Sequence, residues 1–277
     1  MYVKDEDQGM FGLIGENLSH VQDMVYDVNN QLRSMMESGG LAYLELDPIS
    51  CCCYLEGLVG TSRSDFGIQL SQDKGFDYKL FTMIAWDPPG YGYSRPPERA
   101  YGKDVYKNDA DLAAELMAKL GYNLYSLLGW SDGGKVALLM AIKYQSRIDK
   151  LVVWGTGATV TDNERKTLNI FRNVSLIKAD SRELYEKEYG QGFQAMVDKL
   201  ADHYTYLDDI CKDEVHKIRC PTFVIHGDND PVALEHPLYL NEKICDARLH
   251  RFRRGGHDCH KEFSEEFKKI VTEFLLE

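Results

Sequence analysis

The sequence predicts an α/β fold in which helices cover both faces of a mostly parallel sheet. Two observations carry this prediction. From about residue 50 onward, short apolar runs alternate with helical patterns. These runs are mostly continuous, which is typical of strands buried on both faces. The 277 residues suffice for one large domain with a sizeable core.

The expected elements follow one another along the chain. Helical patterns cover 103–120, 134–145 and 260–276. The stretch 158–217 holds amphipathic segments and no convincing strand, so we expect a helical cap inserted there between two strands. This gives a single domain with its core at about 40–157 and 218–277, and residues 1–40 fit neither a strand nor a helix clearly. The apolar runs expected as strands are 51–55, 80–86, 124–130, 150–155, 221–227 and 248–252.

Charge and composition narrow the class of partner. The formal net charge is −12, which argues against nucleic acid or an anionic membrane surface as a partner. The opening MYVKDEDQGM is acidic and lacks an apolar core, so it indicates neither a secretory signal nor a mitochondrial presequence. The seven cysteines form no C-x-x-C pair and are expected as reduced thiols. We therefore expect an intracellular monomer, cytoplasmic or mitochondrial, that acts on a small molecule.

The stretch LLGWSDGGKVAL (127–138) has two incompatible interpretations. Gly129 to Lys135 spells G-x-x-x-x-G-K, the start of a phosphate-binding loop, whereas Gly129, Ser131 and Gly133 spell the G-x-S-x-G of a serine hydrolase. A phosphate-binding loop needs Ser or Thr next for Mg²⁺, and the chain has Val136. We therefore favour the nucleophile and expect Lys135 in the first, exposed turn of a helix.

A serine nucleophile needs a histidine base and an orienting carboxylate, which follow it in the order Asp, then His, in this architecture. The loop after strand 221–227 offers Asp228 or Asp230, and the loop after strand 248–252 offers His257 or His260. We favour Asp230, which Pro231 follows, and His257, which two glycines precede. The segment HDCH (257–260) lacks a visible fourth metal ligand, so neither a metal nor an organic cofactor is expected.

Specific motifs over residues 51–277 carry a family resemblance. They include GLVGTSRSDFG, AWDPPGYGYSRPP, GWSDGG, HGDNDPV and GGHDCH. The chain resembles the α/β-hydrolase superfamily and, within it, the biphenyl hydrolase-like (valacyclovir hydrolase) group. The resemblance implies the α/β-hydrolase fold, with Ser131 as nucleophile, Asp230 as orienting acid and His257 as base.

The resemblance also implies a role for Asp132, whose side chain would bind the α-amino group of an amino-acid ester. The residues alone leave open that Asp132 caps the following helix instead. The backbone N–H groups of Asp132 and Leu58 would form the oxyanion hole. Many superfamily members have His-Gly where this chain has Glu56-Gly57, and a carboxylate near a developing oxyanion would be unfavourable unless it points away.

The expected reaction is hydrolysis of a carboxylic ester, in particular an α-amino acid ester, through an acyl-enzyme. One alternative uses the same three residues on C–C bonds or on simple carboxylesters. An alternative of another class is a binding protein that keeps the fold without turnover. The acidic segment 201–209 (ADHYTYLDD) is expected to be a solvated helix face.

Overall fold

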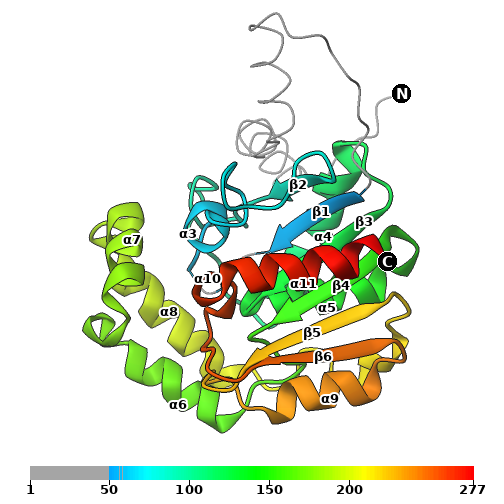
Figure 1. Cartoon of the computed structure of the whole chain (residues 1–277). Helices are drawn as coiled ribbons and strands as arrows, with labels where there is room; N and C mark the ends of the chain where they lie inside the picture. Colours follow the sequence, from blue (N-terminus) through cyan, green and yellow to red (C-terminus); the bar gives the residue numbers. More distant parts are fainter. Residues whose placement is uncertain (1–49, 56, 58) are drawn as a thin grey trace, which may run out of the picture.

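A parallel β-sheet forms the centre of the chain (Figure 1). The computed structural model describes residues 50–55, 57 and 59–277, so the prediction for residues 1–40 lies outside the described residues. The six strands run in the order β2-β1-β3-β4-β5-β6, and each neighbouring pair is parallel. The predicted fold class is therefore confirmed. The strands are β1 (Ser50–Leu55), β2 (Phe81–Ala85), β3 (Tyr125–Trp130), β4 (Ile148–Trp154), β5 (Thr222–Gly227) and β6 (Ala247–Phe252).

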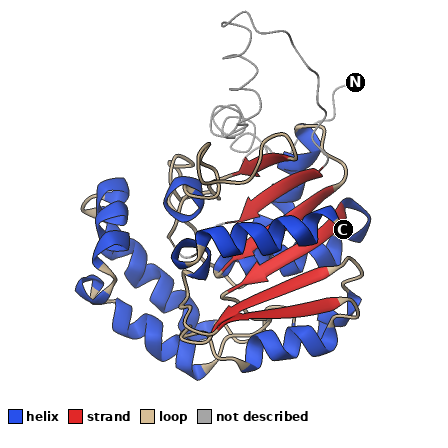
Figure 2. Cartoon of the chain, viewed as in Figure 1, coloured by secondary structure: helices blue, strands red, loops and turns tan. Residues whose placement is uncertain are grey.

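Helices cover the sheet on both faces (Figure 2). On one face α4 (Val105–Lys119), α5 (Asp132–Lys143) and α9 (Glu235–Lys243) enclose a buried apolar cluster with the strands. On the other face α3 (Ser62–Phe66) and α11 (Ser264–Leu276) enclose a second cluster. The helix expected over 260–276 is divided, because Phe263 leaves the helical conformation between α10 (Cys259–Glu262) and α11.

Three helices form a layer beyond the carboxyl ends of the strands, toward which the arrowheads point in Figure 1. They are α6 (Asp162–Phe171), α7 (Ala179–Tyr189) and α8 (Gly192–Tyr206). α6 begins with a capping box. The Thr161 side chain accepts from the backbone N–H of Glu164, and the Glu164 side chain accepts from the backbone N–H of Thr161. Short 3₁₀ turns lie at Gln145–Arg147, Val174–Leu176 and Lys212–Lys217.

All three tryptophans of the chain lie at the carboxyl ends of strands. Trp86 directly follows β2, and Trp130 and Trp154 are the last residues of β3 and β4. All three are buried. The Trp130 indole donates to the carbonyl of His257 at 2.9 Å, and the Trp154 indole donates to Nδ1 of His260 at 3.0 Å. These two bonds tie the loop after β6 to the end of the sheet.

The state of the cysteines and the character of the helices are two further properties of the described residues. Within the described residues the seven cysteines are thiols rather than disulfides, and Cys52, Cys53, Cys211 and Cys259 are buried. No helix within residues 50–55, 57 and 59–277 has the length and apolar character to cross a membrane.

Candidate active site

Ser131 occupies a strained turn between β3 and α5. Its φ of 56° and ψ of −118° lie in a region that residues with a side chain rarely adopt. Close packing surrounds the turn, because a Cβ at Gly129 would come within 2.6 Å of the Gly133 carbonyl oxygen. This explains why the first position of G-x-S-x-G is a glycine. The strain lifts the Ser131 hydroxyl out of the end of the sheet.

A chain of hydrogen bonds connects the three residues selected from the sequence. His257 Nε2 lies 3.0 Å from Ser131 Oγ, and His257 Nδ1 lies 2.9 Å from Asp230 Oδ1. Asp230 follows β5, and its carboxylate also accepts from the backbone N–H of Val232 at 2.8 Å. Burial alone would lower the pKa of His257, but the Asp230 carboxylate outweighs it and raises the pKa above the ordinary histidine value.

The alternative residues weighed from the sequence lie elsewhere. Asp228 forms an ion pair with Arg251 at 2.8 Å. His260 is fully buried, where it accepts from Trp154 and donates Nε2–H to the backbone carbonyl of Asp65 at 3.1 Å. Burial holds the pKa of His260 well below its usual value, so it is a neutral packing residue. Within the described residues, His, Cys, Asp and Glu form no group suited to hold a metal ion.

The loop after β1 is only partly described, since Glu56 and Leu58 lie outside the described residues. The backbone N–H of Gly57 donates to Asp65 Oδ2 at 3.0 Å. Burial raises the pKa of Asp65 to about 6, although Lys261 and the hydrogen bond from Gly57 act in the opposite direction. The Asp65 carboxylate thus fixes the residue that precedes the predicted oxyanion donor. The other predicted donor, the Asp132 N–H, belongs to the first turn of α5, whose N–H groups have no intrahelical partner.

The Asp132 carboxylate lies in a buried polar cluster. Lys135 Nζ donates to Asp132 Oδ1 at 2.7 Å, and Tyr106 donates to Asp132 Oδ2 at 2.7 Å. Tyr204 donates to Asp132 Oδ1 and accepts from Lys135 at 2.6 Å. Burial alone would raise the pKa of Asp132, but Lys135 and the two tyrosines outweigh it and lower the pKa. The carboxylate is therefore ionised and already has an internal cation.

Two expectations from the sequence are wrong at this cluster. Lys135 is not exposed in the first turn of α5 but is 2% exposed, because its ammonium pairs with Asp132. The segment 201–209 is not simply a solvated face, since His203 and Tyr204 are buried and Tyr204 reaches across to α5. The Asp132 carboxylate accepts from the side chains of Lys135, Tyr106 and Tyr204, which favours a role in this cluster over a role as a helix cap.

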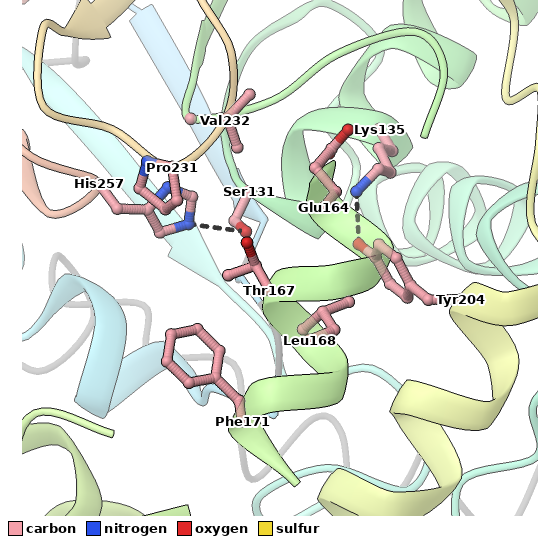
Figure 3. Close-up of a pocket in the computed structure, with 11 residues that line it drawn as sticks. Ser131, Lys135, Glu164, Thr167, Leu168, Phe171, Tyr204, Pro231, Val232 and His257 are labelled. Carbon is pink, nitrogen blue, oxygen red and sulfur yellow. Dashed lines mark hydrogen bonds between the residues drawn. The ribbon is translucent and has the colours of Figure 1, made fainter. Parts of the chain in front are cut away.

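A cavity of about 100 Å³ opens at Ser131 and His257 (Figure 3). Within the described part of the chain, Lys135 and Glu164 are the only lysine, arginine or carboxylate side chains in its wall, and Asp132 is not part of it. Burial would raise the pKa of Glu164, but hydrogen bonding to His236 and the charge of Lys135 lower it to about 2. The rest of the wall consists of Gly155, Thr167, Leu168, Phe171, Tyr204, Pro231 and Val232.

Sequence reasoning missed Lys135, Glu164, Tyr106 and Tyr204 as parts of the site. One signal was available, because Asp132 and Lys135 are three residues apart and so share a helix face. The two tyrosines come from α4 and α8, and no spacing along the chain links them to Asp132.

Comparisons with known proteins identify the family and support the fold. Residues 53–177 match the family model described as the alpha/beta hydrolase fold. The human "Serine hydrolase BPHL" is 39% identical over 228 residues, which cover 80% of this chain and 77% of that protein. A 2-hydroxymuconate semialdehyde hydrolase of Pseudomonas sp. (strain CF600) is 30% identical, covering 70% of this chain and 76% of that protein. A crystal structure of the meta-cleavage product hydrolase of Pseudomonas fluorescens IP01 has a TM-score of 0.66 at 25% identity, covering 83% of this chain and 90% of that one.

Proposed function

This chain belongs to the α/β-hydrolase family and is a serine hydrolase, and from that premise we propose that it cleaves carboxylic esters through an acyl-enzyme intermediate. The observation that carries the proposal is the hydrogen-bonded series Ser131–His257–Asp230, of which Ser131 and His257 line a cavity. This arrangement supplies a nucleophile, a base and the carboxylate that orients the base.

The proposed reaction has two halves. His257 Nε2 takes the Ser131 proton as Oγ attacks the ester carbonyl, and the resulting alkoxide is held by backbone N–H groups that include that of Asp132. His257 then gives its proton to the alcohol oxygen, the C–O bond breaks and the acyl-enzyme remains. Water, deprotonated by His257, attacks the acyl-enzyme in the same way and releases the acid and free Ser131.

The resemblance to the biphenyl hydrolase-like group favours α-amino acid esters as the substrate class, with Asp132 binding the ammonium. The geometry favours esters without an α-amino group instead, because within the described residues the Asp132 carboxylate is paired with Lys135 and does not line the cavity. C–C bond hydrolysis is a second candidate, favoured by the 30% identity to the 2-hydroxymuconate semialdehyde hydrolase. Hydrolysis of amino-acid esters, of their des-amino counterparts and of a ring-cleavage product distinguishes the three substrate classes: amino-acid esters, other carboxylic esters and C–C bonds.

Active-site labelling tests the proposal against a binding protein without turnover. A fluorophosphonate should form a covalent adduct on Ser131 in the folded protein, and heat-unfolded protein should not react because the triad is dispersed. Mass spectrometry of the labelled peptide identifies the site. Absence of an adduct in folded protein would contradict the serine-hydrolase mechanism.

The pH profile is a separate prediction. Protonated His257 cannot accept the Ser131 proton, and Asp230 raises the pKa of His257. Activity is therefore present above that raised pKa and is lost as the pH falls through it. We expect kcat/KM to rise with pH through an ionisation above the ordinary histidine value of about 6.5. Asp230→Asn should lower both the rate and the midpoint of this rise, and an unchanged midpoint would argue against the Asp230–His257 pairing.

A further inference from the structure

Lys135 presents a buried ammonium to the cavity that contains the nucleophile. It lies on α5, one turn after Ser131, and it is part of the cavity wall (Figure 3). Its Nζ donates to Asp132 and to Tyr204, at 2.7 and 2.6 Å. An ammonium has three N–H donors, so one more remains for an acceptor in the cavity.

The Asp132 carboxylate has little capacity left for a ligand. It accepts one hydrogen bond from each of Lys135, Tyr106 and Tyr204. Its side chain faces a second, smaller cavity that it shares with Gly57, Arg99 and other residues, apart from the one at His257. A group entering beside Ser131 therefore meets Lys135 before it could reach Asp132.

Glu164 is the other charged residue in the wall, and most of its bonding is used by Thr161 and His236. Its Oε2 accepts from the Thr161 backbone at 2.8 Å and from the Thr161 hydroxyl at 2.9 Å, and lies 3.1 Å from His236 Nε2. These contacts fix the start of α6 and turn the carboxylate toward its own helix. The hydroxyls of Tyr204 and Thr167 already donate, to Asp132 and to the backbone carbonyl of Asn163. Of the wall residues, Lys135 is thus the charged donor with an N–H left for an acyl group.

We propose that Lys135 determines which acyl groups this cavity accepts: its ammonium holds the place beside Asp132 that a substrate ammonium would need, so uncharged acyl groups with an oxygen acceptor are preferred to their α-amino counterparts. The proposal rests on the ester hydrolysis inferred above. Bringing a second cation beside Lys135 in a buried site is unfavourable, whereas a hydroxyl or keto oxygen can accept its remaining N–H.

The test compares matched esters that differ only in an α-amino or an α-hydroxy substituent. Wild type should give the higher kcat/KM with the α-hydroxy ester. Lys135→Met keeps the length of the side chain and frees the Asp132 carboxylate, so the amino-to-hydroxy ratio of kcat/KM should rise about tenfold or more. Adding Asp132→Asn to Lys135→Met should remove that rise, which identifies Asp132 as its source.

A matched control makes the same change outside the cavity. Lys143 is on the same helix but pairs with Asp111 at the surface, so Lys143→Met should leave the ratio unchanged. A wild type that prefers α-amino esters overturns the proposal, and this result can be read even if Lys135→Met fails to fold. A Glu164→Gln variant that shifts the ratio while Lys135→Met does not would also overturn it. If the enzyme hydrolyses none of the esters, the result contradicts the proposed ester hydrolysis. This outcome is distinct from one that contradicts only the role of Lys135.

Discussion

Ser131→Ala should abolish ester hydrolysis, with a fall in kcat on the order of 10⁶-fold, as found when a triad serine is removed elsewhere. The alanine cannot form the acyl-enzyme, and His257 is left without the hydroxyl that lies 3.0 Å from its Nε2. Binding should persist, because the cavity wall is otherwise unchanged. Steady-state hydrolysis of a p-nitrophenyl ester measures the loss of kcat, and direct titration of a non-hydrolysed ester analogue measures the retained affinity.

The same strand provides a matched control. Ser126 on β3 is fully buried, and its hydroxyl has no hydrogen-bond partner within the described residues. Ser126→Ala makes the same chemical change in the same strand, outside the cavity, and should leave kcat close to wild type. Comparable losses in the two variants would show that the Ser131 effect comes from the fold and not from the chemistry.

Asp109→Ala should destabilise the protein by about 3–5 kcal/mol, the range for removing one partner of a buried ion pair. Arg99 and Asp109 pair with each other, and each side chain is 6% exposed. The Arg99 guanidinium also donates to the carbonyl of Pro89 at 3.1 Å and lies over the ring of Tyr91. Without Asp109 its charge has no compensating partner, so the loop that precedes α4 loses its attachment. We expect the melting temperature to fall on the order of 10 °C by calorimetry.

A double replacement distinguishes the uncompensated charge from lost packing. Arg99→Met with Asp109→Leu removes both charges and keeps apolar volume in their place, and such exchanges are often neutral or stabilising. The double variant should therefore recover most of the melting temperature lost in Asp109→Ala. Equal melting temperatures for the single and double variants would indicate that packing and the bond to Pro89 dominate.

The sequence predicted the sheet and the residues of the hydrogen-bonded series because both depend on local order. Most of the strands contain a continuous apolar run, such as LVVW within β4, and parallel strands end at one edge. Ser131 lies in the turn after β3, and Asp230 and His257 lie in the loops after β5 and β6, so the topology brings them together at that edge. Their order along the chain narrowed the choice to these loops, and Pro231 and the two glycines before His257 then favoured Asp230 over Asp228 and His257 over His260.

The surroundings of Ser131 were not predictable in the same way. Lys135 follows two glycines at the start of a helix, and in sequence it looks like an ordinary exposed lysine. Its burial depends on Tyr204, which comes from α8 in the inserted helices, and on Tyr106 from α4. Long-range packing of this kind leaves no periodic signal in the chain. The charge of the cavity was consequently the part of the site that required the structure.

The positions of the tryptophans make the intrinsic fluorescence of this protein sensitive to changes at the candidate active site. Indole emission depends on the polarity and quenching groups around each ring, and here every indole sits where the sheet meets the loops, two of them in contact with the imidazoles of His257 and His260. Tryptophan fluorescence of the unlabelled chain therefore depends on the surroundings of the carboxyl ends of the strands and not on an average over the whole interior. Acylation of Ser131 or displacement of the His257 loop can be followed in real time without attaching a dye.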